Sequence, residues 1–600
     1  DVRQIMGIFF LNFSNIFFFS KTLANFFYTI SIRFFKIAYF MIIKRIKNFL
    51  IIFLICIIQS NSYSEDVYVD PEPYTTDSTY NNKYYEGLNI IVVTANDYAT
   101  KIGYDILQNG GTVFDAAVSI QIALGLVEPQ SSGLGGGLFI TLFDNNSEKI
   151  MTYEGRETAP KSINQNLFLD ENQKPKKFFS AVVGGLSVGT PGTLKALYEL
   201  NKDYGTIEWK YLLKPVIDLA REGFIPPKRL VSALKKEKHL FEVEPNLKFK
   251  EILDNPNEKF FNLDYANTLE KISEDIEDFY YGQIASNIVE KIKNSKNPGF
   301  MTNSDLANYK VNKKNALCRK LKNEFKVCGP SLPSSGTISI IQALKLYESF
   351  FHQNKIINSE ESFRLKLSIL NFVYYLRDKH LGDDNFDIVN VDELLNTKFL
   401  LKEFDSFKKN KINLTNENLD EILNSTSHFT LVDKYRNVIS LTSSIESSFG
   451  SRLFTDGFFL NNQLTDFRFR TTDINGKVLK NIPQGNKKPL SSMSPLIIFD
   501  KNDNFYMTVG SPGGKAIISY VFRVVSEDFF SDYKIKEIVE RPNFLKINGR
   551  NFFEKKILND ISSVRGKIRN LTSGLAIIKK KNESYIGVAD SRRDGSVRGK

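Results

Sequence analysis

The chain has 600 residues, 42% of them hydrophobic, so it can bury a large core and is neither disordered nor fibrous. The net charge of +11 would suit a nucleic-acid or membrane partner, but positions 1–64 contain seven basic residues and one acidic residue. The basic excess that remains is spread over a long chain and follows its general composition. The sequence therefore predicts no nucleic-acid partner.

The first 64 residues have the features of an export signal preceded by extra sequence. From Met41, a basic segment is followed by the apolar stretch Phe49–Ile58 and the small residues Ser62-Tyr63-Ser64. This order is typical of a cleaved secretory signal. We predict that 41–64 is a signal peptide, that 1–40 is an upstream extension foreign to the native protein, and that the protein is periplasmic or secreted. An uncleaved membrane anchor is the alternative.

The cysteines and histidines limit the possible chemistry. Without the signal, only Cys318 and Cys328 remain, and their proximity in an exported chain makes them a candidate disulfide. The four histidines are scattered, and no Cys/His cluster predicts a metal site. A catalytic triad built on histidine is therefore not expected, and we predict no metal or organic cofactor.

The predicted elements change in character along the chain. Strands are expected at LNIIVVTAN and 138–143, and helices at 98–107 and 113–126. Helical patterns then dominate; they cover 193–224, 264–314 and 359–411. From Asn424 onward the sequence becomes rich in strands, with one helix near 516–525; the predicted strands are HFTLV, VISLTSS, GFFLNN, LIIFD, FYMTVGS and YIGVAD. This order predicts a mixed α/β chain.

A hydroxyl-rich segment, Ser425-Thr426-Ser427, directly precedes the first of these late strands. Taken alone, it is most simply a turn. A threonine hydroxyl needs an adjacent base to become a nucleophile. An N-terminal threonine carries its own base, an α-amino group with a pKa of about 7.7–8.0. A catalytic Thr426 would therefore require chain cleavage between Ser425 and Thr426, which the hydroxyl itself could perform.

Several blocks resemble the γ-glutamyltransferase family, in that family's order. The segment around Thr426, with Asn437, Ser444 and Phe449-Gly450 following, resembles the start of the family's small subunit. The other blocks extend over nearly the whole exported chain; they are GGTVFDAAVSIQIALGLVEPQSSGLGGGLF, GRETAP, VGTPGTLKALYEL, LLKPVIDLAREGF, PSSG, FLNNQLTDF, PLSSMSP and TVGSPGG. The resemblance implies the four-layer αββα sandwich of the N-terminal nucleophile hydrolases.

The resemblance also implies a role for each site residue. Thr426 would be the nucleophile, supported by the Ser444 hydroxyl, with Gly513 and Gly514 as oxyanion donors. Other residues would bind the amino-acid head of the substrate. In this group Arg156, Ser491 and Ser492 would hold its α-carboxylate, Asp466 would pair with its α-ammonium, and Gln463 and Glu446 would lie beside it.

Some assignments have simpler alternatives, and some residues depart from the family pattern. Arg156 could be an ordinary ion-pair partner, and Ser491-Ser492 a turn. His428 is expected to be a packed strand residue rather than a base. Arg436 stands where the family usually has glycine, and Ser444 where it usually has threonine.

We therefore predict a precursor cleaved into a large subunit, 65–425, and a small subunit, 426–600. It would transfer the γ-glutamyl group of glutathione or related compounds to water or to amino-acid and peptide acceptors. A related acylase acting on glutaryl amides is one alternative; Asp466 and Glu446 argue against it, because a glutaryl group has no ammonium. An inactive membrane-anchored scaffold is the other.

Overall fold

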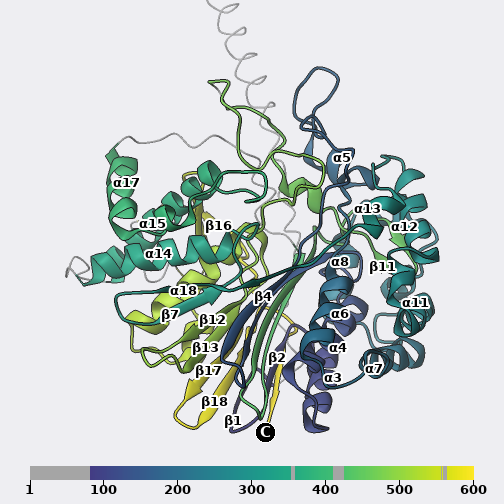
Figure 1. Ribbon diagram of the computed structural model, residues 1–600, viewed down its shortest axis with the longest axis horizontal. Coiled ribbons are helices and arrows are strands. Elements are labelled where there is room, and N and C mark those ends of the chain that lie inside the picture. The colour runs from purple at the N-terminus through teal and green to yellow at the C-terminus, as the bar shows by residue number, and fades with distance from the viewer. Residues whose placement is uncertain (1–81, 353–358, 410–424, 474, 556, 558–563) are drawn as a thin grey trace, which may run out of the picture. The chain divides into compact units, whose positions relative to one another are not determined.

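The computed structural model describes residues 82–352, 359–409, 425–473, 475–555, 557 and 564–600. The predicted extension 1–40 and signal peptide 41–64 lie outside these residues. Two seven-stranded antiparallel sheets lie between layers of helices, which confirms the predicted αββα arrangement (Figure 1). None of the described helices is long and apolar enough to cross a membrane.

Sheet I contains the strand of the predicted nucleophile. Its strands in spatial order are β19 (Ser596–Gly599), β2 (Ile91–Thr94), β8 (Ser425–Val432), β9 (Val438–Glu446), β3 (Gly137–Asp144), β4 (Lys149–Gly155) and β5 (Asn312–Asn315). Sheet II faces it; its order is β1 (Tyr84–Gly87), β18 (Ser584–Ala589), β17 (Ala576–Lys581), β13 (Phe505–Gly510), β12 (Leu496–Phe499), β7 (Lys326–Gly329) and β6 (Leu317–Lys320).

Two small sheets complete the strands of the described residues. They are β10 (Phe454–Thr455) with β11 (Phe458–Phe459), and β14 (Phe544–Ile547) with β15 (Arg550–Phe553) and β16 (Lys567–Ile568). The hairpin β8–β9 carries the predicted cleavage site, at the start of β8 in the middle of sheet I.

Helices cover the outer face of each large sheet. On sheet I lie α3 (Asp97–Gln108), α4 (Val113–Val127) and α6 (Thr193–Tyr204), and beyond them α7 (Trp209–Glu222) and α11 (Leu263–Glu274). On the side of sheet II lie α14 (Gly336–Phe351), α15 (Ser359–His380), α18 (Ile517–Phe530) and α19 (Ile535–Glu540). The other helices are α5 (Phe178–Val182), α8 (Lys228–Lys236), α9 (Leu240–Val243), α10 (Lys250–Asp254), α12 (Gln283–Lys293), α13 (Asn303–Ala307), α16 (Val391–Leu394) and α17 (Thr397–Lys409).

Alternation of side chains along β8 divides its residues between two cores. Phe429 and Leu431 pack in the core shared with the helices on sheet I. Val432 packs in the core between the sheets, and Thr430 bonds to Thr508 of β13 there. Because side chains two apart share a face, Thr426 points toward sheet II. The fold thus places the predicted nucleophile at one end of the interface between the sheets.

Both sheets are built from chain on either side of the predicted cleavage site. Sheet I alternates β19, β8 and β9 with strands that precede residue 425, and sheet II joins β12 of the later part to β7 of the earlier part. The two predicted subunits are therefore interleaved. Separating them would expose the edges and faces of several buried strands.

Three sequence predictions differ from the structure. The helical region 264–314 is wrong at its end, because Asn312–Asn315 pairs with β4 as the edge strand of sheet I. Of the expected strand GFFLNN, only Phe458–Phe459 is a strand, because the chain then turns toward the pocket described below. The third difference is strand β1, Tyr84–Gly87, for which no strand was predicted; it pairs with β18. The structure also contains the disulfide between Cys318 and Cys328, which links β6 to β7.

Candidate active site

A β-bulge lies at the predicted cleavage position. Ser425 pairs with Glu446 and Thr426 with Ser444, so that β9 contributes one extra residue, Ile445. Glu446 takes a left-handed conformation with φ of 80° at this point. Bulges bend a strand and redirect its side chains. Here the bulge brings the Ser425 carbonyl within reach of a side chain of β9.

That side chain is Ser444, whose hydrogen bonds define the direction of its proton. The backbone N–H of Glu446 donates to Ser444 Oγ at 2.9 Å, and Ser444 Oγ donates to the Ser425 carbonyl at 2.8 Å. Since the serine has one proton, Thr426 Oγ1, 3.3 Å away, must donate to Ser444 Oγ. Ser444 therefore polarises the carbonyl that Thr426 would attack and orients the attacking hydroxyl.

A buried polar cluster lies on the other face of β8. Ser425 Oγ donates to Ser131 Oγ at 2.9 Å, and Ser427 Oγ donates to Glu128 at 3.1 Å. Arg229 donates to the same Ser131 oxygen at 2.8 Å. Burial raises the pKa of Glu128, and the charge of Arg229 opposes this shift. The cluster fixes the side chains on either side of Thr426. Its members outside β8 were not predicted from the sequence.

His428 is enclosed between the sheets. Its Nδ1 lies 2.9 Å from Thr442 Oγ1, and a Cβ added to Gly510 of β13 would lie 2.2 Å from its ring. Burial lowers the pKa of His428 to about 3, so its ring is neutral at neutral pH. This environment is that of a packed core residue, as expected.

The proposed head-binding residues Arg156 and Asp466 contact each other. Arg156 Nη2 lies 2.6 Å from Asp466 Oδ2, and the amide of Gln463 donates to the same oxygen at 2.6 Å. Arg156 Nε donates to the carbonyl of Pro489 at 3.0 Å. The arginine is fully buried and rigidly held, which excludes the alternative of an ordinary surface ion pair.

Glu157 lies behind this pair. Its carboxylate is 3.5 Å from Arg156 Nη1, and neither of its oxygens has a hydrogen-bond partner among the described residues. Burial raises the pKa of Glu157 to about 7, although the charge of Arg156 opposes the shift. Arg156 thus has one partner, Asp466, that faces the pocket, and another, Glu157, that is enclosed in the core.

Ser491 and Ser492 are held by the loop that precedes α14. The Ser491 N–H donates to the Pro333 carbonyl at 2.9 Å, and Ser335 Oγ donates to the Ser491 carbonyl at 2.6 Å. Ser492 Oγ is buried without a hydrogen-bond partner among the described residues. A buried hydroxyl that lines a pocket in this way is available to a bound acceptor such as a carboxylate.

Gly513 and Gly514 connect β13 to α18 and have φ values of 131° and 52°. A Cβ on Gly513 would lie 2.7 Å from the ring of Tyr520, so glycine is needed there for both conformation and space. The loop enters the N-terminus of α18, a 14-residue helix. The partial positive charge at that end favours an anion beside the loop.

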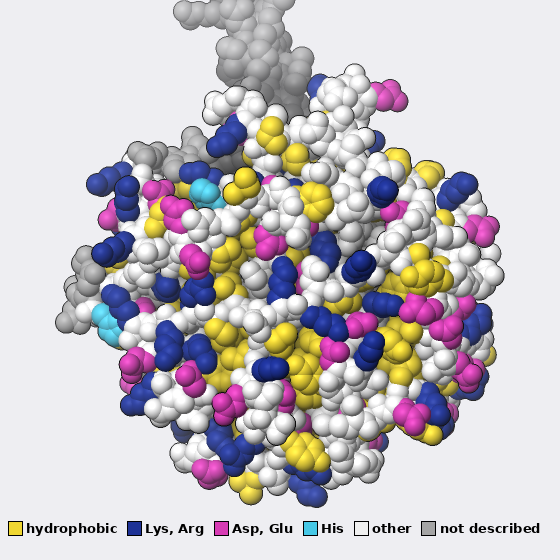
Figure 2. Space-filling view, viewed as in Figure 1, with side chains coloured by type: hydrophobic (Ala, Val, Ile, Leu, Met, Phe, Trp, Pro, Cys, Tyr) yellow, Lys and Arg dark blue, Asp and Glu magenta, His cyan; other side chains and the backbone are white. Residues whose placement is uncertain are grey.

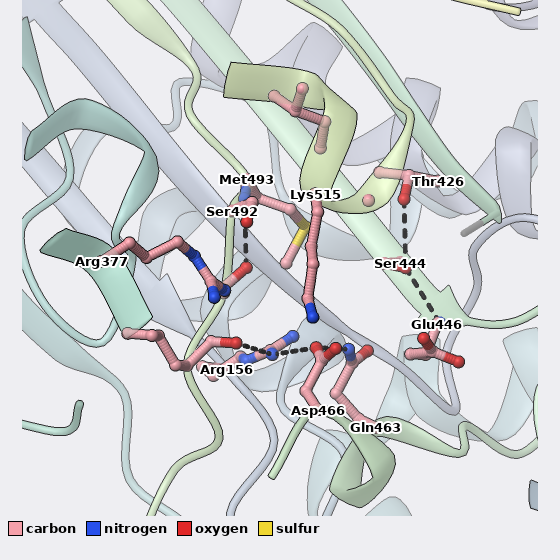
Figure 3. A pocket seen from close by; sticks show the side chains of 14 residues that line it. Arg156, Arg377, Thr426, Ser444, Glu446, Gln463, Asp466, Ser492, Met493 and Lys515 are labelled. Carbon is pink, nitrogen blue, oxygen red and sulfur yellow. Dashed lines mark hydrogen bonds and ion pairs between the residues drawn. The ribbon is translucent and has the colours of Figure 1, made fainter. Parts of the chain in front are cut away.

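These groups converge on one pocket of about 330 Å³, a volume that includes its open side (Figure 3). The pocket brings together all the predicted site residues except Gly513 and Ser425; its lining residues are Arg156, Arg377, Thr426, Ser444, Glu446, Gln463, Asp466, Leu490, Ser491, Ser492, Met493, Gly514, Lys515 and Ile517. Arg377 and Lys515 were not predicted. Figure 3 shows Lys515 extending between the Thr426 side and the Asp466 side.

The arrangement can bind a zwitterion and attack a carbonyl next to it. Arg156 supplies a fixed cation and Asp466 an anion, both near one end, while Thr426 lies at the other end (Figure 3). Gly514 lines the same pocket. A layered αββα fold with a threonine at the start of a central strand is that of the N-terminal nucleophile hydrolases.

Comparison with known proteins then gives the family. The family model for Gamma-glutamyltranspeptidase matches residues 99–599, so the chain belongs to the gamma-glutamyltranspeptidase family. It is 32% identical to the "Glutathione hydrolase proenzyme" of Bacillus subtilis strain 168, over 86% of this chain and 92% of that protein. It is also 32% identical to the protein of the same name from Escherichia coli K12, over 76% of this chain and 80% of the relative.

The fold also resembles that of solved structures. The crystal structure of cephalosporin acylase from Bacillus halodurans superposes with a TM-score of 0.72, covering 88% of this chain and 98% of that one, at 20% identity. This similarity concerns the fold. It does not distinguish a γ-glutamyl substrate from a glutaryl one.

Proposed function

We propose that this protein is an exported γ-glutamyltransferase and glutathione hydrolase that cleaves its own chain before Thr426. The proposal rests chiefly on one observation, the pairing of Arg156 with Asp466 at 2.6 Å in the pocket that contains Thr426. The α-amino-acid part of a substrate can take the place of the direct contact between these two residues. Its α-carboxylate would then bind Arg156 and its α-ammonium would bind Asp466. A γ-glutamyl side chain then extends toward the nucleophile.

Self-cleavage begins with the unbroken chain. Thr426 Oγ1 attacks the Ser425 carbonyl carbon, and the developing oxyanion is stabilised by the Ser444 hydroxyl that already donates to that oxygen at 2.8 Å. Breaking the C–N bond gives an ester and frees the Thr426 amine, which takes the hydroxyl proton. Water hydrolyses the ester, leaving Ser425 as a new C-terminus and Thr426 with a free amine and a free hydroxyl.

Turnover uses the group that self-cleavage provides. The Thr426 amine accepts the proton of its own hydroxyl as Oγ1 attacks the substrate γ-carbonyl. Backbone N–H groups of the Gly513-Gly514 loop and the N-terminus of α18 stabilise the oxyanion. The departing amine takes the proton, and a γ-glutamyl ester remains on Thr426. Water or an acceptor amine then releases the γ-glutamyl group.

Thr426→Ala tests the nucleophile. Without the hydroxyl, self-cleavage and acyl transfer both lose the attacking atom, so the variant is expected to remain a single chain and to hydrolyse γ-glutamyl-4-nitroanilide at less than about 0.1% of the parent rate. The readouts are a denaturing gel and release of nitroaniline. Normal turnover by this variant would overturn the mechanism.

A matched substrate separates the proposal from the acylase alternative. Glutaryl-4-nitroanilide differs from the γ-glutamyl compound by lacking the α-ammonium group, so Asp466 would be left without its partner. We expect kcat/KM to favour the γ-glutamyl substrate by at least about 100-fold. A preference for the glutaryl substrate would favour the acylase, and binding without turnover of either substrate would favour an inactive scaffold.

A further inference from the structure

A second cavity lies away from the catalytic pocket, where α14, α15 and α18 meet. It encloses about 1190 Å³, including the part open to solvent. Aromatic side chains form part of its wall, among them Tyr347 of α14 and Phe530 of α18. The remaining walls carry charged groups that the mechanism above does not use.

The charged groups form a buried cluster around a single carboxylate. Glu527 of α18 lies 3.7 Å from Lys366 of α15, 3.6 Å from Arg523 and 3.2 Å from Arg541. Lys366, Arg523 and Glu527 are all more than nine-tenths buried. Two buried cations and the partly exposed Arg541 therefore share one buried anion, an arrangement that is costly for the buried charges unless a further anion is present.

Hydrogen bonding in the cluster is also incomplete. Glu527 Oε2, Arg541 Nε and Arg523 Nη2 are buried and have no hydrogen-bond partner among the described residues. The charges are close enough to form ion pairs, but the two donors, Arg541 Nε and Arg523 Nη2, make no hydrogen bond to a described residue. Buried donors of this kind are normally satisfied by protein, water or ligand.

Among the residues that the structure describes, neighbouring charges reduce this excess of positive charge without removing it. Arg592 is bonded to both Asp590 and Glu554, so this adjacent group contributes one net negative charge. It cancels one of the two extra cations. Burial lowers the pKa of Lys366, and the charge of Glu527 opposes the shift; a second anion nearby would hold this lysine in its charged form.

We propose that this cavity binds a small oxyanion, a phosphate or carboxylate group attached to an apolar or aromatic body. The oxyanion contacts Lys366 and Arg541, and the apolar part lies against Tyr347 and Phe530. Arginine and lysine donors suit both oxyanions, and charge-assisted hydrogen bonds make the contact strong.

The position of the cavity relates it to the catalytic pocket. Lys366 and Arg377 both lie on α15, eleven residues or about 16 Å apart along the helix. Glu527 is near the end of α18, and Ile517, which lines the catalytic pocket, is at its start. A ligand whose oxyanion contacts Lys366 of α15 and whose apolar part contacts Phe530 of α18 therefore binds two helices that also reach the catalytic pocket.

Calorimetric titration of the full purified chain at low salt tests the proposal, with phenyl phosphate, inorganic phosphate and neutral benzyl alcohol as probes. We expect saturable binding of phenyl phosphate with Kd below about 1 mM, weaker binding of inorganic phosphate and no binding of benzyl alcohol. Lys366→Met should weaken the binding of phenyl phosphate at least about tenfold. Lys101→Met, on the exposed face of α3, is the matched control and should leave it unchanged.

Two further variants keep the result interpretable. Arg541→Gln changes a partly exposed residue that lines the cavity and should also weaken binding, even where Lys366→Met fails to fold. Arg156→Gln should leave phenyl phosphate binding intact, because Arg156 belongs to the catalytic pocket. The proposal is overturned by no saturable binding up to about 10 mM, by unchanged binding in both cavity variants, or by binding that depends on Arg156.

Discussion

Ser444 is the residue on which the geometry of self-cleavage depends most. It receives the Glu446 N–H and donates to the Ser425 carbonyl, so its hydroxyl is fixed before any reaction begins. The sequence resemblance assigned Ser444 to the support of the nucleophile's amine. The uncleaved chain adds a second role, at the carbonyl that must be broken.

Ser444→Ala should slow self-cleavage by about 100-fold, because it removes the hydroxyl that donates to the oxygen of the Ser425 carbonyl, where the oxyanion develops. Ser444→Thr keeps the hydroxyl and is the matched control. Conversion of freshly purified precursor to two chains, followed on denaturing gels, gives the rate. Equal maturation of the alanine variant and the parent would show that the 2.8 Å contact does not assist the reaction.

Glu157 makes stability depend on pH. Its pKa is raised from 4.5 to about 7 in the folded chain, so between these values the folded state holds a proton that the unfolded state has lost. Stability is therefore greatest at low pH with respect to this group and falls as pH rises to about 7, by about 3 kcal/mol in total.

Glu157→Gln should remove this dependence, since glutamine resembles the protonated acid. Both proteins also carry Thr426→Ala, so that they remain uncleaved. As the pH is raised from 5 to 8, we expect the thermal midpoint of the glutamine variant to rise by a few degrees relative to that of its parent. Parallel pH profiles for the two proteins would contradict the raised pKa. The parent chain measured beside the variant controls for all other titrating groups.

At the residue scale, the sequence predicted the pocket more completely than it predicted the contacts within it. Short motifs identified Thr426, Arg156 and Asp466, because each stands in a distinctive block. Nothing in a motif indicates that Arg156 and Asp466 bond to each other across 310 positions. Arg377 and Lys515 lie on or beside ordinary amphipathic helices, so only the fold shows that they reach the pocket.

At the element scale, the turn of the β8–β9 hairpin contains one residue with a strained backbone conformation. Arg436 has φ of 66°, a conformation that costs an L-residue about 1 kcal/mol or more and costs glycine nothing. The side chain of Asp433 holds the turn by accepting from the N–H groups of Tyr435 and Asn437. The turn therefore keeps its shape without the glycine usual in the family.

Arg436→Gly should stabilise the uncleaved Thr426→Ala chain by about 0.5–1 kcal/mol, the relief of strain being offset in part by the greater freedom of glycine in the unfolded state. Urea denaturation gives the midpoint. Lys434→Gly is the control; Lys434 is not among the described residues with positive φ, so glycine there should destabilise. A destabilising Arg436→Gly would contradict the strain.

Helices with clear caps and strands with strong patterns were predicted well from sequence. Thr112 and Asp115 form a capping box at the start of α4, close to the predicted boundary. The short edge strand Asn312–Asn315 was missed because its polar sequence has no strand pattern, and it is stabilised by pairing with β4. The bulge at Ile445 was also invisible, because it depends on the register between two strands.

At the scale of the whole molecule, the interleaved sheets determine what cleavage can do. Strand β8 lies between β2 and β9, and β12 lies between β7 and β13. Cleavage before Thr426 therefore leaves each chain paired with the other on both large sheets. We expect the two chains to elute together on size exclusion and to separate only in denaturant; dissociation under native conditions would contradict this arrangement.

The most direct test of self-cleavage is the intact mass of the purified protein, with N-terminal sequencing of each chain. Self-cleavage predicts two chains, of which the smaller begins Thr-Ser-His at Thr426. That result would establish the free amine on which the catalytic role of Thr426 depends. A folded protein that remains one unbroken chain at neutral pH would have no such amine, and the proposed enzyme mechanism would be wrong.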